Sequence, residues 1–294
     1  MTYRSGFVAI IGSPNVGKST LMNRLVGQKV SIVSDKAQTT RNRIMGVMTR
    51  PGWQIVFLDT PGVITPKNRL GDYMLKVAYE ALHEVEAILF LVDAKRGIGR
   101  KDEAILEKLR EAKAPVVAGI NKADLCTLDD IETARERLEK EPCIRQVVKL
   151  SALEGRGVDQ LTEALASYLV EGPQYFPDDM VTDQPERILC GEIIREKALQ
   201  MLREEVPHGL GVGVDKMEQR EDGVQDIWAT IYCERNGHKG IVIGKQGAML
   251  KRIGTEARKD IEWLLGNKVN LQLWVKVKED WRNSAAMLGE LGYE

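Results

Sequence analysis

An octapeptide near the amino terminus constrains this chain more than any other feature of its sequence. Residues 12–19 read Gly-Ser-Pro-Asn-Val-Gly-Lys-Ser, which fits the pattern G-x-x-x-x-G-K-[ST]. The apolar run 7–11 precedes the pattern and an apolar helical pattern follows it, so a buried strand, a glycine-bounded loop and a helix are expected in this order. Backbone N–H groups of such a loop and the positive end of the helix form a cradle for phosphate oxygens. The sequence therefore predicts a P-loop that binds a nucleoside triphosphate.

The P-loop pattern assigns roles to two side chains. The ammonium group of Lys18 is expected to reach the β- and γ-phosphates, and the hydroxyl group of Ser19 is expected to ligate Mg²⁺. The residues predicted to contact the phosphates are Gly12, Ser13, Pro14, Asn15, Val16, Gly17, Lys18, Ser19 and Thr20.

A second polar motif follows a predicted β-hairpin. Apolar runs at 44–48 and 53–58 are separated by Pro51-Gly52, a turn signal, and the second run ends in Asp-Thr-Pro-Gly. Asp59 can hold Mg²⁺ through a water, and the N–H of Gly62 can meet a γ-phosphate without obstruction by a side chain. The nucleotide contacts predicted here are Asp59, Thr60, Pro61, Gly62 and Val63.

Strand and helix patterns alternate through the first half of the chain. Strands are expected at 87–92, 115–120 and 147–150, and helices at 102–112 and 158–170. This alternation predicts an α/β fold in which a mainly parallel sheet carries helices on both faces, with ligands at the carboxyl ends of the strands. Each polar motif follows such a strand end, so the motifs are expected to converge on one site.

The motif after the strand at 115–120 selects the base. A carboxylate at Asp124 can accept two N–H bonds from guanine, whereas adenine offers no matching pair of donors. The N–H of Ala152 is expected to meet guanine O6. The residues predicted at the base are Asn121, Lys122, Ala123, Asp124, Ser151, Ala152 and Leu153.

Taken together, these motifs resemble those of a translation-factor-class GTPase. The resemblance implies GTP hydrolysis with catalytic contributions from Lys18, Gly62 and a switch threonine that also ligates Mg²⁺ beside Ser19 and Asp59. That threonine falls on Thr39 or Thr40, and its position favours Thr40.

Ras-type enzymes carry a water-orienting glutamine after D-x-x-G, whereas this chain has Val63, so intrinsic hydrolysis is expected to be slow. Another group or a partner must then accelerate the reaction. In some GTPases of this kind an asparagine placed like Asn15 recruits a monovalent cation, which raises K⁺ as a further cofactor. Gln38 and Arg41 are nearby polar candidates for the group that accelerates hydrolysis, although a solvated loop accounts for the polar character of both residues.

The pattern changes after residue 171. Residues 173–185 contain three prolines, an acidic cluster and no periodicity, which is typical of a linker. A helix is expected at 188–202, strands at 211–217 and 227–233, a helix through 249–265 and a strand at 269–277. The order α-β-β-α-α-β, with Gly244-Lys245-Gln246-Gly247 between the two later helices, resembles a prokaryotic-type (type II) KH domain of the α+β class.

Local charge supports RNA binding by this second region. From residue 183 onward there are 17 Lys and Arg against 19 Asp and Glu, but residues 235–259 contain seven Lys or Arg and one acid, Glu256. Paired glycines let the backbone approach a nucleic-acid strand closely. The predicted RNA contacts are Lys239, Ile243, Gly244, Lys245, Gln246, Gly247, Lys251 and Arg252.

Composition bounds the remaining possibilities. The chain has 294 residues, a net charge of −1 and no apolar run long enough to cross a membrane. Its four dispersed cysteines are typical of reduced thiols in the cytoplasm. We expect a GTPase domain at 1–172, the linker at 173–185, the KH domain at 186–280 and a tail at 281–294. That tail is expected to cover the KH sheet.

The arrangement of a GTPase domain, this linker and a terminal KH domain resembles a family of bacterial Ras-like GTPases that act on the small ribosomal subunit. The resemblance implies a cytoplasmic monomer that binds small-subunit rRNA near its 3′ end, assists subunit assembly and associates peripherally with the inner face of the cell membrane. A second hypothesis is a switch in cell-cycle regulation that acts on a protein or membrane client, with the KH fold as a docking module. A third, a metabolic kinase, lacks any visible acceptor motif.

Overall fold

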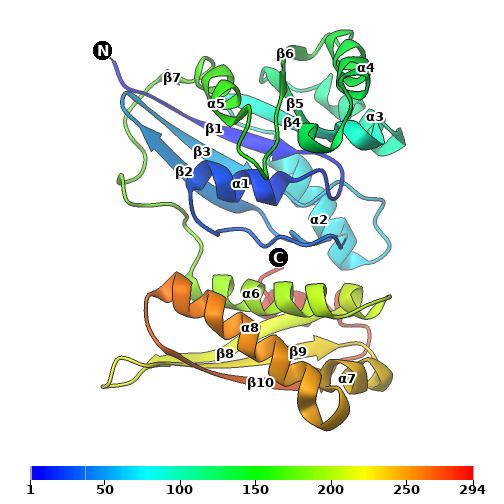
Figure 1. The fold of residues 1–294 in the computed structure, drawn as a ribbon, viewed down its shortest axis with the longest axis vertical. Helices are drawn as coiled ribbons and strands as arrows, with labels where there is room; N and C mark the ends of the chain where they lie inside the picture. The colour runs from blue at the N-terminus through cyan, green and yellow to red at the C-terminus, as the bar shows by residue number, and fades with distance from the viewer. Residues whose placement is uncertain (1, 37, 294) are drawn as a thin grey trace. The chain divides into compact units, whose positions relative to one another are not determined.

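The structure, a computed structural model, describes residues 2–36 and 38–293 and divides into two compact units. Segments from several parts of the sequence make up each unit (Figure 1). The first comprises Met1–Ser31, Thr40–Pro66 and Met74–Asp183, and the second comprises Ile32–Thr39, Lys67–Tyr73 and Gln184–Glu294.

The first unit is built on a sheet in the order β2-β3-β1-β4-β5-β6, with β7 paired to β1. All neighbours along this path are parallel except the β2–β3 hairpin, and β7 runs antiparallel to β1. The strands are β1 (Arg4–Ile11), β2 (Ile44–Arg50), β3 (Trp53–Asp59), β4 (Ala87–Asp93), β5 (Val116–Asn121), β6 (Ile144–Lys149) and β7 (Val170–Glu171). The predicted mainly parallel sheet is therefore confirmed.

Helices cover both faces of this sheet, as the sequence predicts (Figure 1). Buried side chains of α1 and α5 pack against one set of strand residues, and those of α2, α3 and α4 pack against the alternate set. The helices are α1 (Lys18–Val26), α2 (Arg69–Glu80), α3 (Arg100–Leu109), α4 (Leu128–Glu139) and α5 (Val158–Ala166), with short 3₁₀ turns η1 (Ala94–Arg96) and η2 (Ala123–Leu125).

Some elements differ from the sequence expectations. The helix expected at 158–170 ends at Ala166, because Val170 and Glu171 extend and pair with β1. The segment expected to be a linker packs along β2 and β3: Phe176 and Met180 join the apolar cluster there. The N–H of Val47 donates to the Val181 carbonyl at 2.9 Å. Most residues of 173–185 remain exposed, and the apolar side chains of Phe176 and Met180 explain why the segment contacts these strands.

The second unit contains the α-β-β-α-α-β order that the sequence predicts. Its sheet has the order β10-β9-β8, in which β10 is parallel and β8 antiparallel to β9. The elements are α6 (Glu186–Met201), η3 (Val206–Gly209), β8 (Gly211–Gln219), β9 (Gln225–Cys233), α7 (Asn236–Ile243), η4 (Lys245–Gly247), α8 (Ala248–Leu265), β10 (Val269–Val277), η5 (Trp281–Asn283) and α9 (Ala285–Glu290). Apolar side chains of α6, α8 and all three strands form its core.

The tail packs against β8 rather than extending away from it. Trp281 is fully buried, and its indole Nε1 donates to the Gly209 carbonyl at 2.9 Å. A Cβ atom at Gly211 would lie 2.8 Å from Leu291 Cδ1, so glycine at this position admits the tail. Among the helices of residues 2–36 and 38–293, none is both long and apolar enough to cross a membrane.

Candidate guanine-nucleotide site and RNA groove

The P-loop leaves β1 at Gly12 and enters α1 at Lys18. Two of its glycines are required by close approaches: a Cβ at Gly12 would lie 2.3 Å from the Leu91 carbonyl oxygen, and one at Gly17 would lie 2.2 Å from Asn121 Nδ2. Gly17 also has φ 103°, a conformation that side chains rarely adopt. The half-buried Thr20 follows within α1. The strand, loop and helix therefore occur as the octapeptide predicts.

Lys18 is held inside the loop. Its Nζ donates to the carbonyl oxygens of Gly12 at 2.9 Å and Ser13 at 3.1 Å, and the residue is buried. Burial lowers the pKa of Lys18 from 10.5 to about 8, partly offset by the charges of Asp59 and Asp102. A buried ammonium group with incomplete charge compensation is suited to bind phosphate.

Three oxygen atoms from distant segments meet at the start of α1. Ser19 Oγ lies 2.9 Å from Thr40 Oγ1 and donates to Asp59 Oδ2 at 3.1 Å. Asp59 is fully buried, and its Oδ1 has no hydrogen-bond partner among the residues that the structure describes. A buried carboxylate oxygen left unpaired beside two hydroxyl groups is a donor set that Mg²⁺ prefers. These residues therefore fit the metal.

The charge state of Asp59 depends on its surroundings. Burial raises the pKa of Asp59, and this effect is opposed by the charge of Lys18 and by hydrogen bonds from Ser31 and Ser19. Ser31 Oγ donates to Asp59 Oδ2 at 2.9 Å. Ser31 could not be identified from the sequence, because a single serine in a polar loop carries no pattern.

The two adjacent threonines have different orientations. Thr40 Oγ1 lies in the oxygen cluster beside Ser19, whereas Thr39 Oγ1 donates to the Lys36 carbonyl at 2.7 Å. Thr40 is also buried. This geometry favours Thr40 as the metal-ligating threonine.

The D-x-x-G segment lies against the P-loop. Thr60 Oγ1 donates to the Ile10 carbonyl at 2.7 Å, and a Cβ at Gly62 would lie 3.0 Å from Pro14 Cα. Pro61, which lies between Thr60 and Gly62 in the chain, is buried. The Val63 side chain is buried and belongs to the apolar core, so it offers no polar group to orient water.

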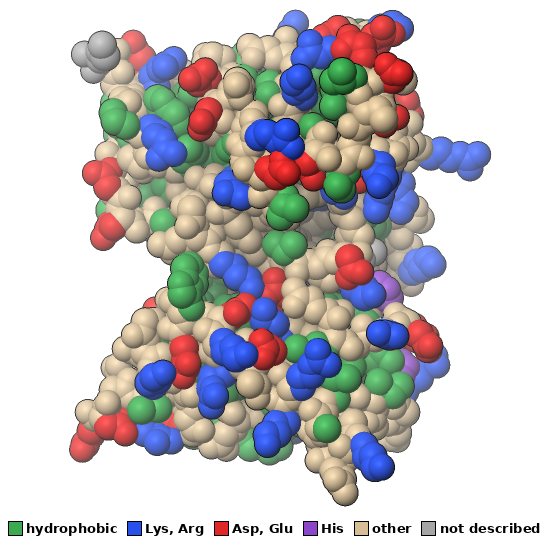
Figure 2. All heavy atoms as spheres, viewed as in Figure 1, with side chains coloured by type: hydrophobic (Ala, Val, Ile, Leu, Met, Phe, Trp, Pro, Cys, Tyr) green, Lys and Arg blue, Asp and Glu red, His purple; other side chains and the backbone are tan. Residues whose placement is uncertain are grey.

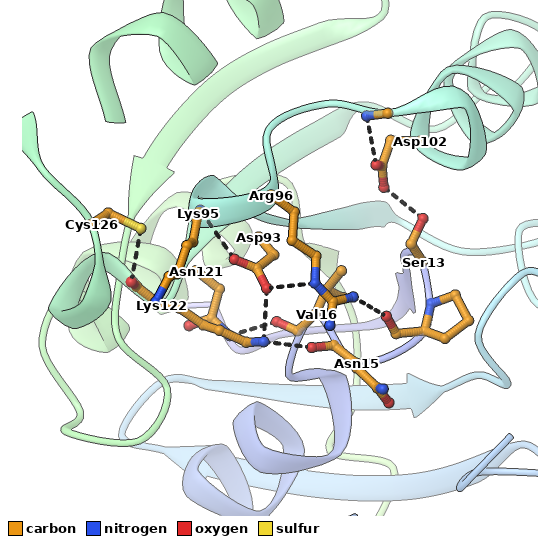
Figure 3. A network of polar contacts seen from close by, with 12 residues as sticks. Ser13, Asn15, Val16, Asp93, Lys95, Arg96, Asp102, Asn121, Lys122 and Cys126 are labelled. Atoms are coloured by element: carbon orange, nitrogen blue, oxygen red, sulfur yellow. Dashed lines mark hydrogen bonds and ion pairs between the residues drawn. The ribbon is translucent and has the colours of Figure 1, made fainter. Parts of the chain in front are cut away.

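Asn121 and Lys122 connect the end of β5 to the P-loop (Figure 3). Asn121 Nδ2 donates to the Val16 carbonyl at 2.8 Å, and Lys122 Nζ donates to the Asn15 carbonyl at 2.7 Å. Lys122 Nζ also pairs with Asp93 Oδ2 at 2.8 Å. Asp93 was not among the predicted site residues, although an acidic residue at the carboxyl end of a buried strand is a usable signal.

The remaining base-site residues lie on either side of Asn121. Ala123 and Asp124 begin η2 and are half-buried, while Ser151 and Ala152 are buried and Leu153 is exposed. The N–H of Ala152 donates to Asn121 Oδ1 at 2.9 Å, so contact with guanine O6 requires this N–H to be shared or released.

In the second unit, a groove of about 430 Å³ lies beside the G-x-x-G turn. Gly244 (φ 72°) ends α7, and Gly247 (φ 79°) caps α8. Of the predicted RNA contacts, Gly247 and Lys251 line this groove. Its other lining residues are Leu250, Gly254, Thr255, Arg258, Leu271 and Leu273.

The other predicted RNA contacts lie around this groove. Gln246 (φ 51°) and Lys245 form the turn itself, Lys239 and Ile243 lie on α7, and Arg252 is exposed on α8. Figure 2, viewed from the same side as Figure 1, shows Lys and Arg side chains spread over the surface of α6 and α8. The leucines of the groove were not predicted from the sequence, because leucines at helical and alternating spacing look like core residues.

Comparisons with known proteins agree with both domains. The family model described as "50S ribosome-binding GTPase" matches residues 7–122, and the KH-domain model matches residues 205–282. GTPase Era of Alkaliphilus metalliredigens is 53% identical over 295 residues, which cover all of both chains.

Two solved structures are similar over nearly their whole length. Era in complex with MgGDPNP and nucleotides 1506–1542 of 16S ribosomal RNA is 42% identical, with a TM-score of 0.95 and 99% of both chains covered. Era of Aquifex aeolicus bound to GDP·AlF₄⁻ is 42% identical, with a TM-score of 0.94 and the same coverage. The chain therefore belongs to the Era family of GTPases, in which a GTPase domain is followed by a KH domain.

Proposed function

We propose that this protein is a GTP-hydrolysing switch that binds 16S rRNA through its KH domain and assists assembly and maturation of the small ribosomal subunit. One observation carries the nucleotide part: Ser19, Thr40 and Asp59 bring three side-chain oxygens together below the P-loop. A related Era has been solved with MgGDPNP and with 16S rRNA nucleotides 1506–1542, which supports the RNA partner.

The oxygen cluster supports a specific set of metal ligands in this proposal. Ser19 and Thr40 would hold Mg²⁺ directly, and Asp59 would hold it through a water molecule. Bound Mg²⁺ supplies charge neutralisation at the β- and γ-phosphates. Lys18 would release the two P-loop carbonyls that it contacts and donate to phosphate oxygens, and the Gly62 N–H would face the γ-phosphate.

Specificity for guanine rests on Asp124. Its carboxylate would accept from guanine N1 and N2, while Lys122 and Asn121 keep the P-loop and base loops together. Because Val63 is apolar and buried, hydrolysis is slow until another group acts. A K⁺ ion near Asn15 is one such group.

In the KH domain, the predicted contacts around the G-x-x-G turn would bind backbone phosphates of the RNA, and the groove leucines would contact its bases. An apolar floor with basic residues at its rim is suited to single-stranded RNA. In this proposal the protein is a cytoplasmic monomer with peripheral contact to the inner face of the cell membrane.

The experiment titrates a labelled RNA with the sequence of the small-subunit rRNA 3′ end into the full chain loaded with a non-hydrolysable GTP analogue or with GDP. We expect preference for this RNA over a scrambled RNA of the same composition, with an affinity that differs between nucleotide states. Equal binding of both RNAs would contradict the rRNA assignment. It would favour a protein or membrane client, with the KH fold as a docking module.

A further inference from the structure

A buried hydrogen bond joins the P-loop to α3. Ser13 Oγ donates to Asp102 Oδ1 at 2.6 Å, and both residues are buried. The other carboxylate oxygen, Oδ2, accepts from the Gly99 N–H at 3.0 Å, which makes Asp102 the third residue of a helix-capping arrangement. One carboxylate therefore binds the P-loop and the first turn of α3 at once (Figure 3).

The 3₁₀ turn η1, which precedes α3, holds the next P-loop residue. Arg96 Nη1 donates to the Pro14 carbonyl at 3.3 Å, and Arg96 Nε lies 3.6 Å from Asp93 Oδ2. Lys122 donates to the Asn15 carbonyl, and Asn121 donates to the Val16 carbonyl. Every residue from 13 to 16 is therefore anchored by a side chain from outside the loop.

These anchors determine where the loop N–H groups point. In a trans peptide the C=O and the following N–H lie on opposite sides of the plane. Donors that hold the carbonyls of residues 14–16 on the outer side therefore turn the N–H groups of residues 15–17 towards the phosphate cradle. The cradle is thus oriented from outside before a phosphate enters it.

We propose that Asp102 is a positioning residue for nucleotide phosphates, acting through Ser13. This inference rests on the proposed GTP site. Ser13 begins the anchored stretch, and its hydroxyl bond to Asp102 is the shortest of the four contacts and the one formed between two buried side chains. When Lys18 releases the Gly12 and Ser13 carbonyls to bind phosphate, the bond to Asp102 is the anchor that still holds Ser13. Loss of that bond then lets the start of the loop move relative to the anchored residues 14–16 and their cradle. Because GDP and GTP use the same cradle, both should bind less tightly.

A purely structural role as a helix cap is the competing explanation, and the chain offers a matched control. Asp130 occupies the same third position at the start of α4, where its carboxylate accepts hydrogen bonds from Thr127 N and Oγ1. Thr127 lies between η2 and α4, outside the P-loop. Asp130→Ala removes a helix cap without touching the P-loop. Asp102→Asn provides the conservative rescue, because its amide can accept from Gly99 N–H and donate to Ser13 Oγ.

The test measures GDP affinity, GTPase KM and kcat, and thermal unfolding of the full chain for these variants, for Ser13→Ala and for Asp102→Ala. We expect GDP affinity to fall about tenfold in Ser13→Ala and in Asp102→Ala, and the double variant to lose no more than either single one. KM for GTP should rise by a similar factor with kcat within about twofold, the signature of lost uniform binding. Asp102→Asn and Asp130→Ala should bind GDP within about threefold of the wild type.

The results separate the two explanations. If Asp102→Ala lowers the melting temperature as Asp130→Ala does but leaves GDP affinity unchanged, Asp102 is a helix cap alone and the inference is overturned. Additive losses in the double variant would also overturn it, since the two residues would then act separately. If the wild type itself fails to bind GDP, the proposed function fails instead.

Discussion

The side-chain oxygens of Ser19 and Thr40 lie 2.9 Å apart, one at the start of α1 and the other in the loop before β2. Two hydroxyl groups this close, beside a buried carboxylate with an unpaired oxygen, are arranged to share a cation. A cation held there would connect the loop that carries Thr40 to the start of α1.

Thr40→Ala should weaken binding of a GTP analogue about tenfold in the presence of Mg²⁺, because one metal ligand is lost. In EDTA the variant and the wild type should bind alike. Thr39→Ala is the matched control, since its hydroxyl donates to the Lys36 carbonyl and lies outside the cluster. If Thr39→Ala shows the larger Mg²⁺-dependent loss, the ligand assignment is reversed.

Nucleotide affinity should decrease above pH 8. Lys18 in the nucleotide-free protein has a pKa of about 8, so at higher pH it is mostly neutral and must take up a proton to bind phosphate. We expect affinity for GDP to fall by up to about tenfold per pH unit above that value. Calorimetry in buffers of different ionisation enthalpy would detect the proton uptake. Binding that is flat from pH 7 to about 10 would contradict the role of Lys18.

Lys18 also makes the free energy of unfolding depend on pH, with a trend opposite to that of nucleotide affinity. Between pH 8 and 10.5 the unfolded chain keeps the Lys18 proton while the folded, nucleotide-free protein has lost it. The unfolded state then binds more protons, so the contribution of Lys18 to the free energy of unfolding rises with pH in this window. Denaturant titrations of wild type and Lys18→Met at several pH values would isolate the contribution as their difference.

Asp124→Asn should exchange GTP for xanthosine triphosphate. The amide can no longer accept two N–H bonds from guanine, so GTP affinity should fall about a thousandfold, while xanthine offers an oxygen to the new N–H donor. Competition between labelled GDP and unlabelled xanthosine diphosphate measures the exchange. Unchanged GTP affinity would remove Asp124 from the base site.

Gly247→Asp should weaken RNA binding more than tenfold, because a carboxylate at the groove repels phosphates. Gly223→Asp is a matched control in the β8–β9 turn. Both glycines have positive φ, 79° and 83°, and at both a Cβ would meet nothing within 4 Å. Equal losses in the two variants would indicate a general charge or folding effect rather than a local RNA contact.

The motif residues could be placed from the sequence because parallel strands bring their carboxyl ends to one edge. Gly12, Asp59 and Asn121 each follow or end such a strand, so spacing along the chain translates directly into proximity. The α-β-β-α-α-β order of the second unit was predictable for a related reason, since alternating and helical apolar patterns are long there.

The anchoring residues could not be placed in the same way. Ser31, Arg96 and Asp102 are isolated polar residues whose partners lie elsewhere in the sequence, so only the fold reveals their role. The helix α4 is a different case. Thr127 and Asp130 form a capping box, and the spacing of these two residues is a signal that can be recognised in the sequence alone.

Phosphate release from GTP by the purified full chain is the decisive measurement for the proposed GTPase site. We predict slow, Mg²⁺-dependent release of inorganic phosphate from GTP, none from ATP, and loss of turnover in Lys18→Ala. Equal hydrolysis of ATP and GTP, or turnover that persists in EDTA or in Lys18→Ala, would contradict it.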